Sequence, residues 1–273
     1  MNANARPPAP TPGAPARLRG EALRVGYGPG REILHGIDVD VLDGELTVIV
    51  GPNACGKSTL LKALARMLKP SAGRATLDGR QLHEIPPKAL ARELGLLPQS
   101  PSAPSGITVG DLVARGRYPH QSLLRQWSPD DERAVADALD AANVADLVDR
   151  RVEELSGGQR QRVWIAMALA QQTSILLLDE PTTFLDVAHQ VEVLDLAKRM
   201  QREGGTVVAV LHELNLAFRY ATHVIVMREG RVIGQGAPAD IIDAELIERA
   251  FDLPCTIIPD PVAGTPLVIP GRA

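Results

Sequence analysis

Aromatic residues are scarce in this chain. Phe, Trp and Tyr together make up 3% of its 273 residues, and the net charge at pH 7 is −4 rather than positive. Nucleic-acid-binding proteins usually carry a basic surface, and many hold single strands by stacking bases on aromatic side chains. Because both features are missing, we expect no nucleic acid among the partners of this protein.

Cysteine is equally rare, with Cys55 and Cys255 far apart in the sequence. Two separated cysteines favour free thiols in a reducing compartment over a disulfide. No apolar run approaches the roughly 18 residues of a membrane-spanning helix. The opening MNANARPPAPTPGAPA lacks the apolar centre of a secretory signal, and its Pro and Ala content is typical of disorder. We therefore predict a disordered tail over residues 1–16 and an intracellular protein that is soluble on its own.

Hydrophobic residues make up 45% of the chain, enough for a substantial core. Apolar and β-branched runs broken by Gly and Asp predict three short strands between residues 17 and 50. Farther on, a helical pattern over 157–172 precedes the strand-like SILLLDE, and a second over 187–203 precedes TVVAVLH. Alternating strands and helices predict an α/β fold with a mostly parallel core sheet covered on both faces. The first strands would form an N-terminal antiparallel region.

The stretch from about residue 100 to 156 has a different sequence pattern, with a loop followed by helical periodicity. ITVGDLVARGR and SPDDERAVADALDAANVADLV predict helices, the second with Ser128 as N-cap and Pro129 at its first position. We interpret this stretch as a helical subdomain inserted into an α/β domain over residues 17–236. Residues 237–273 would form a C-terminal helix and an extended segment.

The segment GPNACGKST, residues 51–59, matches the phosphate-binding P-loop. It follows the apolar run ELTVIV, typical of a buried strand, and opens the pattern KSTLLKALARML, which meets no helix breaker before Pro70. In such a loop backbone N–H groups surround the phosphates, Lys57 contacts the β- and γ-phosphates, and Ser58 is a Mg²⁺ ligand. A chance glycine-rich turn is the alternative, which the strand before and the helix after disfavour. Cys55 needs no role of its own.

The acidic pair that such a site requires follows ILLL. Four aliphatic residues predict another buried strand, whose carboxyl end would place Asp179 where α/β sheets bind ligands. Asp179 would hold Mg²⁺, and Glu180 would polarise an attacking water.

A second phosphate-binding segment is indicated by LSGGQ. Ser156, Gly157 and Gly158 precede the helical run QRQRVWIAMALAQQ, which places N–H groups and a hydroxyl at the positive end of a helix. Taken alone, these residues would be an ordinary N-cap with flexible glycines.

The ordered series GPNACGKST, LLPQ, LSGGQ, ILLLDEPT and HE resembles the ATP-binding subunits of ABC transporters, from residue 18 onward. That resemblance implies that two copies pack head to tail, with each ATP between the P-loop of one copy and LSGGQ of the other. One P-loop and one LSGGQ per chain would then give two sites in a homodimer.

Four further positions take roles from this resemblance alone. Tyr27 matches the aromatic that stacks on adenine, with a strand-edge tyrosine as the alternative. Gln99 matches the glutamine that contacts Mg²⁺ and water and senses the membrane subunit. Asp186 matches the aspartate at the dimer seam, and His212 would reach the γ-phosphate. The resemblance thus implies Lys57, Gln99, Glu180 and His212 as catalytic residues, Ser58, Gln99 and Asp179 as metal ligands, and Tyr27, Gly51, Asn53, Gly56, Lys57, Ser58, Thr59, Ser156, Gly157, Gly158, Gln159 and Asp186 as nucleotide-binding residues.

Two longer stretches indicate which group of ABC transporter ATPases this chain resembles. ARGRYPHQSLLRQWSPDDERAVADAL and DEPTTFLDVAHQ are similar to ATPases of ferric-siderophore importers, whose relatives handle haem and cobalamin. This implies ATP-driven import of an iron chelate at the cytoplasmic face of the inner membrane, with two membrane-spanning permease subunits and, indirectly, an extracytoplasmic substrate-binding protein. Residues 100–127 would border the permease docking site, whereas Arg115, Arg117 and Arg125 would individually be solvated.

Other uses of the same cassette remain open. A haem or cobalamin importer ATPase is one alternative, and an ABC ATPase acting on DNA, ribosomes or cofactor assembly is another. The chain has neither the long coiled coil of the DNA-repair relatives nor the second cassette of the translation factors, which favours transport.

Overall fold

A six-stranded sheet forms the centre of the protein, with strand order β10-β9-β3-β8-β7-β6. The computed structural model describes residues 15–28, 30–121, 127–183 and 185–271. In the sheet, β9, β3, β8, β7 and β6 run parallel, and β10 pairs antiparallel with β9. Every residue of β3, β7 and β8 is buried, as expected for strands covered on both faces. The strands span Leu46–Val50 (β3), Leu94–Leu97 (β6), Ile175–Asp179 (β7), Thr206–Val210 (β8), His223–Arg228 (β9) and Arg231–Gly236 (β10).

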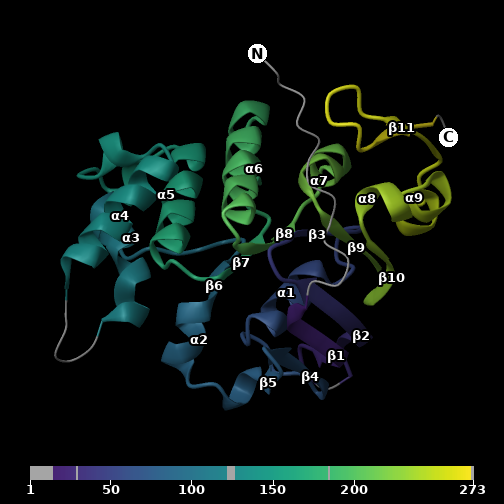
Figure 1. Ribbon diagram of the computed structural model, residues 1–273, viewed down its shortest axis with the longest axis horizontal. Helices are drawn as coiled ribbons and strands as arrows, with labels where there is room; N and C mark the ends of the chain where they lie inside the picture. The colour runs from purple at the N-terminus through teal and green to yellow at the C-terminus, as the bar shows by residue number, and fades with distance from the viewer. Residues whose placement is uncertain (1–14, 29, 122–126, 184, 272–273) are drawn as a thin grey trace.

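A second, antiparallel sheet of order β2-β1-β4-β5 lies beneath the first, with α1 between them (Figure 1). Alternate residues of β3 face the two sides, so that Ile49 packs with α1 and the antiparallel sheet while Val48 and Val50 pack with the helices above. The elements are β1 (Ala16–Gly26), β2 (Glu32–Leu42), β4 (Ala72–Leu77), β5 (Arg80–Gln81), the 3₁₀ helix η1 (Leu82–Glu84) and α1 (Lys57–Leu64). The expected α/β fold with an N-terminal antiparallel region is confirmed.

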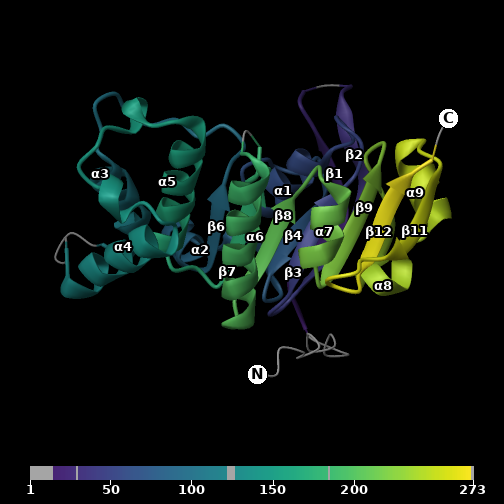
Figure 2. The same ribbon diagram turned by 90° about the horizontal axis from the view of Figure 1, so that it is seen from above.

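The helices α6 (Val187–Arg202) and α7 (Leu214–Tyr220) cover the opposite face of the central sheet (Figure 1). A helical group lies at one end of the molecule, and the C-terminal elements lie at the other (Figure 2). The helical group consists of α3 (Val109–Ala114), the 3₁₀ helix η2 (Arg115–His120), α4 (Pro129–Ala141), the 3₁₀ helices η3 (Ala145–Leu147) and η4 (Val152–Glu154), and α5 (Gly157–Ala170), and α2 (Pro87–Glu93) adjoins it. The predicted boundary at 156 falls just before α5, which shares a hydrophobic cluster with α3 and α4.

The C-terminal elements are two short helices and a hairpin. They comprise α8 (Pro238–Ile241), α9 (Ala244–Phe251), β11 (Cys255–Pro259) and β12 (Pro266–Pro270). The hairpin packs on α7, where Asn215 forms hydrogen bonds with both backbone groups of Val268.

Two helices end earlier than their patterns predict. The run that opens at Lys57 stops at Leu64 because Arg66 adopts a left-handed conformation, with φ of 59°. Its guanidinium donates to the carbonyls of Leu82 and Ile85, a tertiary contact that the local pattern does not reveal. Likewise α4 ends at Ala141, because Asn143 has φ of 52°. The first two strands, predicted to be short, are each 11 residues long.

Three remaining predictions concern the N-terminal tail, membrane-spanning helices and the two cysteines. Residues 1–14 of the predicted tail lie outside the described residues, and β1 begins at Ala16. Among the helices of the described ranges, none is long and apolar enough to cross a membrane. Cys55 and Cys255 are both free thiols, as predicted.

Candidate functional site

The P-loop connects the carboxyl end of β3 to the start of α1. A Cβ on Gly51 would lie 2.2 Å from the carbonyl oxygen of Met227, so the close approach of this backbone to β9 requires glycine. Gly56 has φ of 105°, a conformation that other residues rarely adopt. The Lys57 side chain is 4% exposed, and its Nζ donates to the carbonyls of Gly51 and Pro52, both at 2.9 Å. The lysine is therefore folded back along the loop.

Asp179 lies beside Ser58 at the end of β7. Its side chain is 1% exposed, and Oδ1 accepts a hydrogen bond of 2.7 Å from the Ser58 hydroxyl. Its other oxygen, Oδ2, is buried without a hydrogen-bond partner among the described residues. Burial raises the pKa of Asp179, although Ser58 and the nearby Lys62 and Lys57 act in the opposite direction. A hydroxyl and a buried carboxylate oxygen with unused acceptor capacity fit a magnesium ion, which prefers oxygen ligands and retains water and phosphate in its shell.

Glu180 is held by three side chains. His212 Nε2 lies 2.8 Å from Oε1, and Oε2 accepts hydrogen bonds from Gln99 Nε2 at 2.7 Å and Thr183 Oγ1 at 3.2 Å. Partial burial by itself would raise the pKa of Glu180, but His212, Gln99 and Thr183 outweigh it and lower the pKa. Glu180 itself has φ of 55°, which turns its side chain out of the strand direction of β7. The carboxylate is thus kept ionised and aimed by its neighbours.

Some of these groups line one hollow of about 250 Å³, whereas Gly51, Gln99 and Asp179 are not part of its lining. Tyr27 lies at its edge, with 51% of its surface exposed. Of the sequence-predicted residues, its lining includes Tyr27, Asn53, Gly56, Lys57, Ser58, Thr59, Glu180 and His212. Three more lining residues, Arg31, Ile33 and Ala54, were not predicted. Arg31 and Ile33 line the hollow because the β1–β2 hairpin folds back beside Tyr27. Only the pairing of these two strands could have predicted that position.

The LSGGQ residues lie separately at the start of α5, where Ser156 and Gly157 are exposed and Leu155 is buried. Ser156 Oγ accepts from the Gln159 backbone N–H, and Gln159 Oε1 accepts from the Ser156 N–H, which makes a complete capping box. Asp186 similarly caps α6 and contacts His189 Nδ1 at 2.7 Å. Within the described part of the chain, neither group lines the hollow that holds Lys57. The predicted nucleotide-binding residues therefore fall into two sets on one chain.

Comparison with known proteins agrees with this arrangement. Residues 34–183 match a family model described as "ABC transporter". The chain belongs to the ABC transporter family. It is 54% identical over 256 residues to the ferric enterobactin transport ATP-binding protein FepC of Escherichia coli K12, covering 93% of this chain and 94% of that protein. It is 50% identical over 251 residues to the probable siderophore transport system ATP-binding protein YusV of Bacillus subtilis, covering 92% and 91% respectively.

Solved ABC structures share the fold. A putative metal-chelate type ABC transporter in an inward-facing conformation matches with a TM-score of 0.79 and 29% identity, covering 94% of this chain and 98% of that one. The dimeric ABC transporter cassette MJ0796 matches with a TM-score of 0.72 and 26% identity, covering 81% and 98%. The present chain is accordingly an ATP-binding cassette protein.

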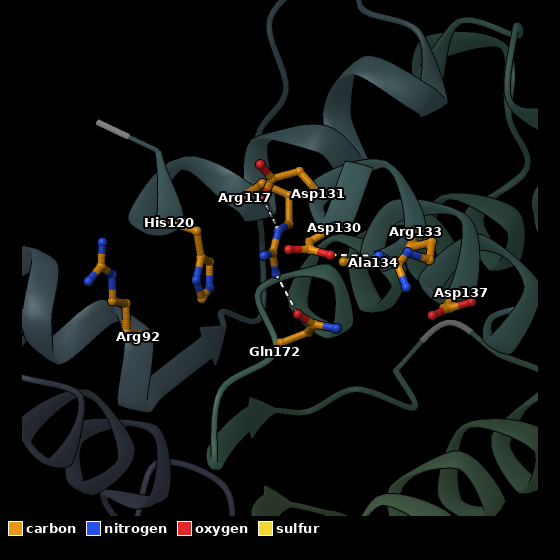
Figure 3. Close-up of a pocket in the computed structure, with 9 residues that line it drawn as sticks. All are labelled: Arg92, Arg117, His120, Asp130, Asp131, Arg133, Ala134, Asp137 and Gln172. Carbon is orange, nitrogen blue, oxygen red and sulfur yellow. Dashed lines mark hydrogen bonds and ion pairs between the residues drawn. The ribbon is translucent and has the colours of Figure 1, made fainter. Parts of the chain in front are cut away.

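A second hollow of this ABC protein, about 580 Å³, lies between α2 and the helical group (Figure 3). Arg117 lines it together with Arg92 and His120 on one side and Arg133 on the other. The expectation that Arg117 is solvated is wrong, because it is 4% exposed and forms an ion pair of 2.9 Å with Asp131. A charge pattern in sequence does not reveal such a partner.

Proposed function

We propose that this protein is the ATP-hydrolysing subunit of an importer for a ferric siderophore. The observation that carries the proposal is the position of Glu180, held by Gln99 and His212 at the mouth of the hollow that contains Lys57. Such an arrangement suits hydrolysis of a phosphoanhydride, because a carboxylate that is kept ionised can accept the proton of an attacking water. The resemblance to siderophore transport ATPases supplies the proposed cargo.

Binding of ATP would use the P-loop side of the hollow. The β- and γ-phosphates would replace the Gly51 and Pro52 carbonyls as partners of Lys57, while the backbone N–H groups at the start of α1 face the same phosphates. Tyr27 would stack on the adenine ring from the edge of the hollow.

The magnesium ion would be held by Ser58 and Asp179, with Gln99 at the side of Glu180. The buried Oδ2 of Asp179 is the atom that supports this assignment. When bound, Mg²⁺ supplies positive charge that offsets the negative charge of the phosphate oxygens. Glu180 would orient water and take its proton as the water oxygen bonds to the γ-phosphorus and the bond from that phosphorus to ADP breaks. His212 holds the Glu180 carboxylate in place and would reach the γ-phosphate.

The LSGGQ residues would act on the nucleotide of a second copy. Ser156 and the glycines expose the N-terminus of α5 to solvent, away from the hollow of their own chain. In a head-to-tail homodimer that terminus faces the phosphates bound at the other P-loop, and Asp186 lies at the seam. ATP then joins the two copies, and hydrolysis separates them.

The membrane partners would be two permease subunits at the cytoplasmic face of the inner membrane, supplied from outside by a substrate-binding protein. Arg117 and His120, from the predicted docking stretch 100–127, line the hollow of Figure 3. This hollow lies between α2 and the helical group and would seat a cytosolic segment of a permease. Arg125 lies outside the described residues.

Iron-siderophore import is favoured over haem import by similarity. The achromobactin transport ATP-binding protein CbrD of Dickeya dadantii is 52% identical over 249 residues, whereas the hemin import ATP-binding protein HmuV of Rhodococcus jostii is 41% identical over 265 residues. Both cover more than nine-tenths of this chain, so the difference is not one of coverage.

The experiment is uptake of ⁵⁵Fe in the source organism after deletion of the gene, with one iron chelate supplied at a time. We expect uptake of at least one ferric siderophore to disappear and to return with the wild-type gene but not with Glu180→Gln. Uptake of ⁵⁵Fe-haem should be unchanged. Loss of haem uptake with every ferric siderophore still transported would contradict the proposed cargo, and unchanged uptake of both would contradict an importer role.

A further inference from the structure

Arg117 connects three helical elements. From η2, its Nε donates to Asp131 Oδ1 on α4 at 2.9 Å (Figure 3). Its Nη1 donates to the carbonyl of Ala170, the last residue of α5, at 2.7 Å and to Gln172 Oε1 at 2.9 Å. A single guanidinium therefore fixes η2, the first turn of α4 and the C-terminal end of α5 relative to one another.

The Arg117–Asp131 ion pair is so deeply buried that mutual attraction alone does not account for its presence. The Arg117 and Asp131 side chains are each 5% exposed. The desolvation of two buried charges can exceed their mutual attraction, so that an apolar pair of similar size is often equally stable. The directional hydrogen bonds of this pair instead fix the position of η2 relative to α4. Asp131 Oδ2 is itself held by the N–H and hydroxyl of Ser128.

η2 is also joined to the core of the cassette through α2. Arg92 Nε donates to the carbonyl of Pro119 at 2.8 Å. His120 Nε2 lies 2.8 Å from the carbonyl of Gln171 after α5, and the Gln171 side chain donates to the carbonyl of Ala91 on α2 at 2.6 Å. The strand β6 follows α2 and leads to Gln99, which contacts Glu180. The wall of the hollow in Figure 3 is thus linked in one direction to Gln99 and in the other to α5.

α5 acts as a rod between this joint and the LSGGQ residues. It has 14 residues, which at the usual rise corresponds to about 21 Å. A Cβ on Gly116 would lie 2.3 Å from the carbonyl oxygen of Met167, so η2 and α5 are in direct backbone contact. A small rotation at the C-terminal end of α5 therefore displaces Ser156 and Gly157 at the other end.

We propose that Arg117 is a positioning residue that sets the direction of α5 and thereby the place at which one copy presents LSGGQ to the nucleotide of the other. This inference rests on the proposed head-to-tail dimer.

The test separates nucleotide binding from dimer formation. In a Glu180→Gln background, Arg117→Met with Asp131→Leu removes both charges and leaves no lone buried ion. With saturating Mg-ATP, sedimentation velocity should give a dimer Kd raised by about tenfold or more. The Kd of the monomer for ATP should stay within about twofold, because Lys57 and Tyr27 are unchanged.

A matched control removes an exposed ion pair on the antiparallel sheet. Arg74→Gln with Glu21→Gln should leave both constants unchanged, because that pair is solvated and does not contact α5. A milder variant, Gln172→Asn, tolerates the local φ of 50° but shortens the side chain that accepts from Arg117. It should raise the dimer Kd by about two- to threefold.

Three results would overturn the inference. The first is a dimer Kd unchanged in both the double variant and Gln172→Asn. The second, if circular dichroism shows the double variant to be unfolded, is an unchanged dimer Kd in Gln172→Asn alone. The third is absence of an ATP-dependent dimer in the Glu180→Gln background itself, which would reject the proposed function together with this inference.

Discussion

At the scale of single residues, the chemistry of this cassette depends on how Glu180 is kept ionised. Burial raises its pKa, and the hydrogen bonds from His212, Gln99 and Thr183 more than compensate. Asp179 instead has a raised pKa, because its side chain is more deeply buried and only one side chain donates to it. The two adjacent carboxylates thus differ in the direction of their pKa shifts because their hydrogen-bond partners and burial differ.

His212→Ala should shift the acidic limb of the pH profile. Without the imidazole, burial still raises the pKa of Glu180 while one interaction that lowers it is gone. Less of the carboxylate is then ionised at a given acidic pH, so the limb of kcat/KM for the residual ATPase activity should move to higher pH. His83→Ala, which removes an exposed histidine outside the hollow, is the matched control. A limb at the wild-type pH in His212→Ala would show that this contact does not set the ionisation of Glu180.

The residues of the nucleotide site were predictable to the extent that they occur in local motifs. Lys57, Ser58 and Glu180 are identified by short segments whose neighbours predict the strand before and the helix after. Arg31 could not be identified in this way, because it reaches the hollow through cross-strand pairing. Arg117 was misjudged for a related reason, since its burial depends on tertiary contacts with α4 and α5.

At the scale of elements, helix ends and the C-terminal hairpin were the least predictable parts. The β11–β12 hairpin packs on the core through Val268 and Ile257, and polar side chains attach it to α7. Asn215 pairs with both backbone groups of Val268, and Asp260 accepts from Arg219 at 2.9 and 2.6 Å. Asp260 also accepts from two backbone N–H groups of the turn that follows.

Asp260→Asn should destabilise the protein by about 1–3 kcal/mol at pH 7, because a buried carboxylate that accepts charge-assisted bonds is lost. The turn N–H groups and Arg219 hold the pKa of Asp260 below its usual value near 4. Its stabilising effect is therefore complete above the unfolded pKa and fades as the pH falls through the folded one. Urea unfolding should give a difference from wild type that shrinks with acidification.

The control for this variant is Asp252→Asn, at an exposed carboxylate paired with Arg228. Its φ of 53° suits asparagine, so the backbone is not strained. No measurable change in stability is expected. An equal loss in both variants, or a loss in Asp260→Asn that does not vary with pH, would show that the buried carboxylate does not act through its charge.

At the scale of the whole molecule, each chain carries the two halves of a nucleotide site in different places. The P-loop hollow contains Lys57 and Glu180, and the exposed start of α5 carries Ser156 outside that hollow. The fold class followed from the alternation of strands and helices, since that alternation allows few topologies. Patterns within one chain do not define how two copies pack, and the head-to-tail dimer is therefore a proposal.

The most direct test of the account is the specific ATPase activity of the purified protein measured over a range of protein concentrations. We predict that activity per molecule rises with concentration toward a plateau, because two copies are needed to complete a site, and that Ser156→Arg removes the rise while leaving ATP binding intact. A specific activity that is independent of concentration and unaffected by Ser156→Arg would contradict a site shared between two copies.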